Sequence, residues 1–144
     1  MKICDGKVKG NTAAKYPSAV VTATELDRYV EIEIAVNKGG GQILVYDKYK
    51  DATNYIAVRK AKDGIITLLK KVNGVNTEVA KTTEKYTDNN LVLAIQCIGN
   101  DHAVFANGTQ ILTGTISEFA SATRVGFSIN ETSDMCDNFK VKYL

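Results

Sequence analysis

The sequence contains no tryptophan, one proline, one histidine and three cysteines in 144 residues. Because tryptophan is absent, any aromatic surface for a ligand must come from the seven tyrosines and four phenylalanines. Because Pro17 is the only proline, the turns must be made with glycine and asparagine. Because His102 is the only histidine, a His–His metal cluster is excluded and there is no second imidazole to act as a general base.

The three cysteines, Cys4, Cys97 and Cys136, are odd in number and far apart in the chain. Their spacing matches neither a disulfide framework nor a zinc-binding motif. We therefore expect reduced thiols, with Cys97 filling core space. A Cys4–Cys136 disulfide stays open at this point, because the two ends of a sandwich domain can meet.

Long apolar runs are also absent. The longest candidate, Leu91–Ile98, has the length of a strand and not the ~18 residues of a membrane span. No apolar segment follows Lys2, so the chain lacks the pattern of a secretory signal, and we expect synthesis in the cytoplasm. The net charge of +2 gives no electrostatic reason to expect nucleic acid or an anionic membrane as a partner.

The dominant pattern in the sequence is an alternation of apolar and polar residues with a period of two. Tyr29–Val36 alternates strictly, and further strand-like runs recur roughly every ten residues. The pairs Asp63-Gly64, Asn73-Gly74 and Asn107-Gly108 supply residues that tolerate the positive φ of tight hairpins. This pattern predicts an all-β, antiparallel β-sandwich that forms a single domain over residues 1–144, with residues 1–16 as an N-terminal arm.

The same alternation predicts which side chains form the core. They are Val30, Ile32, Ile34, Leu91, Leu93, Ile95, Val125, Phe127, Phe139 and Val141.

Several short motifs occur in a characteristic order. Gly99-Asn100 and Asn107-Gly108 bracket one strand, Arg124-Val125-Gly126-Phe127 opens a later strand, and Asp137-Asn138-Phe139-Lys140-Val141 closes the series. Over residues 5–143 this order resembles the concanavalin A-like (laminin-G-like) jelly-roll superfamily of lectins, glucanases and adhesion modules. The resemblance implies a jelly-roll sandwich, a fold that carries many unrelated functions.

Glycosidases of the resembled superfamily carry carboxylates on alternate positions of one strand. Glu31 and Glu33 have this spacing, but the third position is Ala35, and no tryptophan is available for a sugar subsite. We interpret the two glutamates as the solvated face of a strand. No serine-nucleophile, phosphate-loop or dinucleotide motif is present either. The sequence therefore predicts no enzyme and no catalytic residues.

Many members of the superfamily bind Ca²⁺ through loop oxygens. Asp134, Asp137 and Asn138 gather near the C-terminus, and Asp47 and Asp51 flank another loop, but neither set has a regular ligand spacing. We therefore assign no metal site and no cofactor, while a structural calcium ion stays open.

The densest aromatic and polar patch surrounds one loop. Tyr46, Tyr49 and Tyr55 could supply ring faces for a sugar, and Asp51 and Asn54 could supply polar groups. These five residues are the candidate ligand-binding site. The alternative interpretation is that the tyrosine rings cover the edge of the core.

Two functions remain open. One is a non-catalytic, surface-displayed binding or decoration protein of a virus particle, with capsid or tail proteins as partners. The other is a carbohydrate-binding (lectin) module or adhesion domain, excised from a larger extracellular protein, that binds a glycan or cell-surface polymer. The first interpretation, which we favour here, rests on a surface-type fold without an export signal. It predicts location on a virion or an extracellular surface, a second copy of the chain as a further partner, and no binding to nucleic acid or membrane.

Overall fold

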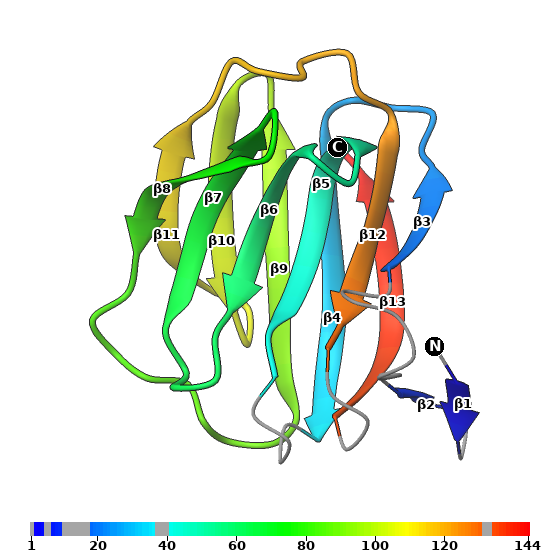
Figure 1. Ribbon diagram of the computed structural model, residues 1–144, viewed down its shortest axis with the longest axis vertical. Coiled ribbons are helices and arrows are strands. Elements are labelled where there is room, and N and C mark those ends of the chain that lie inside the picture. Colours follow the sequence, from blue (N-terminus) through cyan, green and yellow to red (C-terminus); the bar gives the residue numbers. More distant parts are fainter. Residues whose placement is uncertain (1, 5–6, 10–17, 37–40, 131–133) are drawn as a thin grey trace.

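The computed structural model describes residues 2–4, 7–9, 18–36, 41–130 and 134–144. Within these ranges the chain forms thirteen β-strands and no helix. The strands make two antiparallel sheets that pack face to face (Figure 1). None of the described segments is a helix that is long and apolar enough to cross a membrane. The predicted all-β sandwich is therefore confirmed.

One sheet has seven strands. Their spatial order is β1 (Lys2–Cys4), β2 (Lys7–Lys9), β13 (Met135–Tyr143), β4 (Arg28–Val36), β9 (Leu91–Ile98), β10 (Asp101–Ala106) and β11 (Thr109–Thr115). The hairpin β1–β2 pairs with β13, so the described part of the N-terminal arm extends the molecule's own sheet.

The other sheet has six strands. Their spatial order is β3 (Ser18–Thr22), β12 (Arg124–Ile129), β5 (Ile43–Asp51), β6 (Asn54–Lys60), β7 (Ile66–Val72) and β8 (Val75–Lys81). Strands from the two ends of the sequence thus lie next to central strands in both sheets, which is the crossover pattern of a jelly roll.

The core lies between the sheets and follows the predicted alternation. Eight of the ten predicted residues, from Val30 to Phe127, are buried there. The other two, Phe139 and Val141, are partly buried and pack against the same cluster. The prediction of the core face is therefore confirmed, and the edge of the core lies at β13.

Two of the three predicted hairpin turns adopt the expected conformation, whereas at Asp63-Gly64 only Gly64 has a positive φ, of 90°, because residues 61–65 form a longer connection between β6 and β7. Asn73 and Gly74 have φ values of 49° and 82°, and Asn107 and Gly108 have 50° and 81°. Both residues of each pair thus occupy the left-handed region that two-residue hairpins require.

Gly126 in the Arg-Val-Gly-Phe motif has a different structural role. A Cβ atom at this position would lie 2.0 Å from the carbonyl oxygen of Ala19 on β3. Glycine is therefore needed for β3 to pair closely with β12 and complete this end of the six-stranded sheet.

Candidate functional site

The outer face of the six-stranded sheet carries a second apolar cluster. In β5, Ile43 and Val45 point into the core, so the alternate residues Leu44 and Tyr46 point outward. This outer cluster consists of Leu44, Tyr46, Tyr55, Ala57 and Leu69, with Val20 and Tyr49 packed against it.

Three tyrosine rings form the centre of this face. The ring of Tyr46 meets those of Tyr49 and Tyr55 nearly edge-on, each at a centroid distance of 4.9 Å. The rings of Tyr49 and Tyr55 are nearly parallel, at 6.1 Å and 8°. A register shift in β5 between Tyr46 and Lys48 brings Tyr49 opposite Tyr55. The three rings therefore lie on the sheet face opposite the core between the sheets, where Tyr46 and Tyr55 are buried in the outer cluster and Tyr49 packs against it.

A pocket of about 200 Å³ opens above these rings. We call it the tyrosine pocket; besides the three tyrosines, its wall includes Ser18, Gln42, Arg59, Lys71 and Asn76. The hydroxyls of Ser18 and Tyr46 are 3.1 Å apart. The pocket thus combines an aromatic floor with hydroxyl, amide and cationic groups.

Cationic side chains cover part of the aromatic floor. The guanidinium of Arg124 lies 5.2 Å from the ring centre of Tyr49, and Lys71 Nζ lies 5.6 Å from that of Tyr55. Arg59 forms an ion pair with Glu78 at 3.3 Å. Burial and the neighbouring Tyr46 raise the pKa of Tyr49, so its hydroxyl stays protonated and can donate a hydrogen bond.

The two polar residues of the predicted site lie beside the pocket, at the tip of the β5–β6 hairpin. Asp51 Oδ1 accepts hydrogen bonds from the Thr53 amide at 2.9 Å and from Asn54 Nδ2 at 3.0 Å. Asn54 Oδ1 accepts another from the Asn73 amide at 2.9 Å. The bond from the Thr53 amide is the main reason that the pKa of Asp51 is lowered. Neither residue lines the tyrosine pocket. The structure therefore brings the three tyrosines together in the pocket, whereas Asp51 and Asn54 form hydrogen bonds that order the adjacent turn.

Glu31 and Glu33 lie on the other sheet. Their strand, β4, belongs to the seven-stranded sheet, and both side chains alternate with the core residues. Glu31 pairs with Lys140 at 3.8 Å, and Glu33 accepts a hydrogen bond from Asn138 at 2.8 Å. The two glutamates are therefore remote from the tyrosine pocket.

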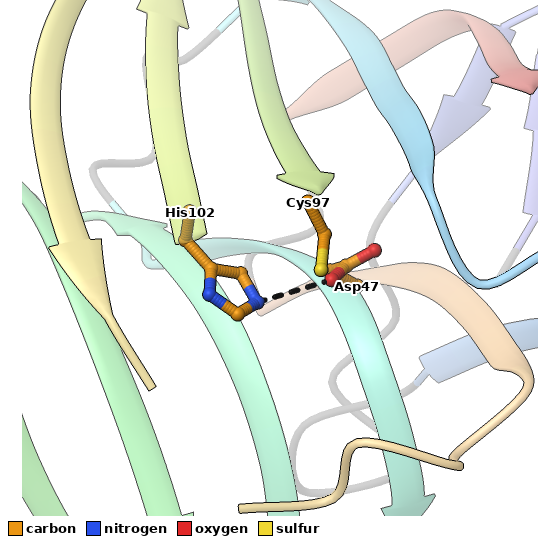
Figure 2. Close-up of side chains that lie close together, drawn as sticks. All are labelled: Asp47, Cys97 and His102. Atoms are coloured by element: carbon orange, nitrogen blue, oxygen red, sulfur yellow. Dashed lines mark ion pairs between the residues drawn. The ribbon is translucent and has the colours of Figure 1, made fainter. Parts of the chain in front are cut away.

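The structure also shows a polar cluster inside the sandwich. Asp47 on β5, Cys97 on β9 and His102 on β10 come together between the sheets (Figure 2). Asp47 and Cys97 are 0% exposed and His102 is 2% exposed. Asp47 Oδ2 lies 3.3 Å from His102 Nε2, and His102 Nδ1 lies 3.0 Å from the carbonyl oxygen of Asn100. His102 follows the Gly99-Asn100 turn, and its side chain points into the interior because it alternates in phase with Val104.

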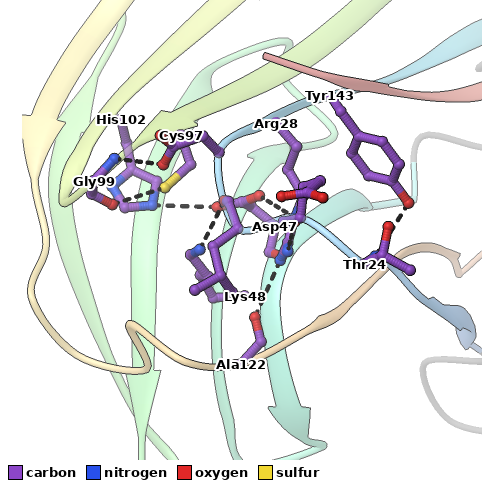
Figure 3. A network of polar contacts seen from close by, with 12 residues as sticks. Thr24, Arg28, Asp47, Lys48, Cys97, Gly99, His102, Ala122 and Tyr143 are labelled. Atoms are coloured by element: carbon purple, nitrogen blue, oxygen red, sulfur yellow. Dashed lines mark hydrogen bonds and ion pairs between the residues drawn. The ribbon is translucent and has the colours of Figure 1, made fainter.

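Arg28 completes this cluster from β4 (Figure 3). Its Nε donates to Asp47 Oδ1 at 3.1 Å, and both partners are fully buried. The guanidinium also donates to the carbonyl oxygens of Glu25, Asp47 and Ala122. One buried carboxylate therefore faces two basic side chains.

The carboxylates considered for calcium are not gathered into one site. Asp47 points into the interior, whereas Asp51 orders the exposed hairpin. Asp134 is buried and accepts a hydrogen bond from the Gly41 amide at 3.2 Å, and Asp137 accepts one from the Asn138 amide at 2.8 Å. Each of these acids thus has a local structural role.

The described thiols are free. Cys97 and Cys136 are buried and unpaired, as expected for reduced cysteines. Burial, followed by the charge of Asp134, raises the pKa of Cys136 to about 12. The side chain of Cys4 lies outside the described residues, but Cys136 forms no disulfide in this structure.

The buried cluster should make stability depend on pH. Burial opposes the charge on His102, but close approach to Asp47 and Cys97 outweighs it and raises the pKa of His102 from 6.5 to about 9. A raised pKa means that the folded state binds the proton more tightly, so this stabilisation is complete below pH 6.5 and is lost as the pH rises through 9. We expect the free energy of unfolding to fall by roughly 1–3 kcal/mol across this range, at about 1.4 kcal/mol per pKa unit.

Urea unfolding at a series of pH values, with a chelator present, measures this effect. The His102→Gln variant is the control, and its stability should change much less between pH 6.5 and 9. An equal decline in both proteins would mean that His102 is not the titrating group.

Comparison with known proteins gives the fold. No protein-family model and no curated protein sequence matches the chain. Among solved structures, the carbohydrate binding module CBM66 from Bacillus subtilis superposes with a TM-score of 0.70 at 15% identity, over 90% of this chain and 83% of that one. Caenorhabditis elegans galectin LEC-6 gives 0.69 at 9% identity, over 96% of each chain.

Sheep galectin-11, in a complex with glycerol, gives a TM-score of 0.65 at 14% identity, over 90% of this chain and 98% of the galectin. These similarities show that the chain has a jelly-roll β-sandwich fold, as its motif order implied.

Proposed function

We propose that this protein is a non-catalytic, lectin-like module that binds a glycan in the tyrosine pocket. The observation that carries the proposal is the pocket of about 200 Å³ on the outer sheet face, floored by Tyr46, Tyr49 and Tyr55. The similar fold of proteins that include one named as a carbohydrate binding module supports it.

The pocket has the two kinds of surface that a sugar requires. A pyranose or furanose ring presents an apolar C–H face, which packs on an aromatic ring, and hydroxyls that need hydrogen-bond partners. Tyr49 is the partly exposed ring of the floor, and the buried rings of Tyr46 and Tyr55 hold it in a fixed orientation. Arg59, Lys71 and Asn76 supply donors at the wall. The contacts among the three rings hold the floor in place before a ligand arrives, which lowers the entropic cost of binding.

The size of the pocket limits what it holds. Sites for drug-sized ligands usually measure roughly 300–1,000 Å³. A pocket of about 200 Å³ therefore suits one sugar unit, with the rest of the glycan lying along the sheet surface.

Binding without catalysis fits the placement of the acidic groups. The two glutamates with glycosidase-like spacing, Glu31 and Glu33, lie on the opposite sheet, and Asp47 is closed within the interior. Glycoside hydrolysis needs two carboxyl groups that flank the scissile bond. We therefore expect binding of a polysaccharide but no hydrolysis of it.

A glycan array tests the proposal, with variants that remove one ring at a time. Tyr49→Ala should reduce binding at least about tenfold, because truncating a central aromatic contact typically costs more than 1 kcal/mol. Tyr29→Ala is the matched control. Tyr29 is also partly buried and contacts a second aromatic ring, Phe105, at 5.6 Å, but it lies on the seven-stranded sheet.

The two variants separate the possible results. Loss of binding in Tyr49→Ala with retention in Tyr29→Ala supports the tyrosine pocket. The reverse result places the site on the other sheet. A wild-type protein that binds no glycan on the array contradicts the proposed function.

The virion-associated decoration role and the surface location remain proposals that rest on the sequence alone. Their test is incorporation of the protein into virus particles, where capsid or tail proteins would be its partners. A decoration interface would have to bury about 1,200 Å² or more in total.

A further inference from the structure

Three ligand-type atoms converge inside the sandwich, away from the tyrosine pocket. A carboxylate oxygen of Asp47, Cys97 Sγ and a ring nitrogen of His102 all lie within 4.8 Å of one another, and Asp47 Oδ2 is 3.3 Å from His102 Nε2 (Figure 2). They come from three strands in two sheets, so the fold itself holds them together.

Two of these atoms lack a hydrogen bond despite full burial. Asp47 Oδ2 and His102 Nε2 are both buried and neither forms one, although they face each other at 3.3 Å. Buried polar atoms are nearly always hydrogen-bonded, whereas these two atoms have only their mutual ion-pair contact, so a metal ion that took its place would leave no hydrogen bond broken.

The remaining polar atom of each side chain is held in place. Asp47 Oδ1 accepts from Arg28 Nε, and His102 Nδ1 lies 3.0 Å from the Asn100 carbonyl oxygen, to which it can donate. Metal-binding histidines usually donate the other ring N–H to a carbonyl or carboxylate in this way, and ligating carboxylates are hydrogen-bonded in turn. This arrangement leaves Nε2 and Oδ2 directed at the shared space.

The spacing of the Asp47 and His102 ligand atoms also suits a metal ion with tetrahedral coordination. Nitrogen and oxygen ligands lie about 2.0–2.1 Å from Zn²⁺, so two of them in tetrahedral geometry are roughly 3.3 Å apart. The measured separation of Asp47 Oδ2 and His102 Nε2 is 3.3 Å. The thiol sulfur lies within 4.8 Å of the other two ligand atoms, and cysteine, histidine and aspartate are all zinc ligands.

We propose that Asp47, Cys97 and His102 form a binding site for one borderline divalent transition-metal ion, of which Zn²⁺ and Co²⁺ are examples. The site is independent of the glycan pocket. A bound ion would join β5 to β9 and β10, and so stabilise the contact between the two sheets.

The charge of the interior permits the exchange of protons for a divalent metal ion. The Cys97 thiol donates a hydrogen bond to the Gly99 carbonyl oxygen at 3.1 Å. A divalent ion that displaces the thiol proton of Cys97 and one ring proton of His102 adds two positive charges to the interior and removes two. The net charge beside Arg28 therefore stays the same, and Arg28 continues to hold Asp47 Oδ1.

Co²⁺ is the probe for the test, because cobalt bound to a thiolate gives a charge-transfer absorption band and zinc does not. The full chain without an affinity tag is titrated in the folded state and is also refolded with Co²⁺ present, so that slow entry cannot hide a site. We expect one Co²⁺ per chain, a thiolate band, and a higher Tm with Zn²⁺ than with chelator.

The cysteine variants decide whether the band comes from this cluster. Cys97→Ser should lose the band and the Zn²⁺-dependent rise in Tm. A Cys4→Ser/Cys136→Ser double variant, in which Cys97 is the only thiol, should keep both. This second variant leaves the cluster intact, so a folding defect in Cys97→Ser would not prevent a decision. A wild-type protein without the band, or a double variant without it, overturns the proposal.

Discussion

An Asp47→Ala variant is expected to lose about 3–5 kcal/mol of unfolding free energy, because removal of the carboxylate leaves buried positive charges without a counter-ion. Asp47 is fully buried and is the carboxylate that faces both Arg28 and His102. In the variant the carbonyl oxygens around Arg28 would remain, but no anion would offset its charge or that of the imidazole. Since the total stability of a domain of this size is roughly 5–15 kcal/mol, such a loss would leave the protein close to unfolding.

Glu78→Ala is the matched control for this prediction. Glu78 also pairs with an arginine, Arg59 at 3.3 Å, but its side chain is 48% exposed. Exposed ion pairs contribute about 0–1 kcal/mol, so this variant should unfold at nearly the wild-type urea concentration. Equal effects of the two variants in urea unfolding would mean that the buried network does not stabilise the fold.

The sequence was sufficient to predict the sandwich because the alternation is strong in the central strands. Val30, Ile32 and Ile34 share one phase in β4, and all three are buried in the core. The hairpins were predictable for a separate reason: Asn-Gly pairs are among the few that accept two consecutive positive φ values, and Asn73-Gly74 does so here.

The candidate site was predictable only in part. The three tyrosines are close in sequence, but strict alternation would put Tyr46 and Tyr49 on opposite faces of β5. The register shift between Tyr46 and Lys48 removes this conflict, and a bulge of this kind has no clear signature in one sequence. Asp51 and Asn54 belong to the same polar loop in sequence, yet their side chains are used in the turn.

The buried polar cluster was missed, although the sequence contains a signal for it. Arg28 shares the phase of Val30, Asp47 that of Val45, and His102 that of Val104, so each ionisable residue stands where alternation calls for a core residue. Each instance alone looks like the end of a strand. Only the pairing of the sheets shows that the three positions meet, since they are separated by up to 74 residues in the chain.

The second large effect is expected for Phe127→Ala, which should cost about 3–5 kcal/mol through lost burial and the cavity left behind. Phe127 is 6% exposed and lies in the core cluster between the sheets. Its ring centre is 5.3 Å from that of Phe139, so it joins β12 of one sheet to β13 of the other. Collapse of the neighbours into the space is restricted because both rings are attached to hydrogen-bonded strands.

Phe105→Ala supplies the same chemical change at a different depth. Phe105 is only partly buried, on the outer face of the seven-stranded sheet beside Tyr29, so its loss should cost about 1 kcal/mol or less. Urea unfolding of the two variants and of Phe139→Ala measures the difference, and the Phe127→Ala/Phe139→Ala double variant gives the coupling between the rings, for which we expect about 0.5–1.5 kcal/mol. A loss below about 1 kcal/mol for Phe127→Ala would mean that this ring does not bridge the two sheets. A large loss without coupling would assign its contribution to the aliphatic core and not to Phe139.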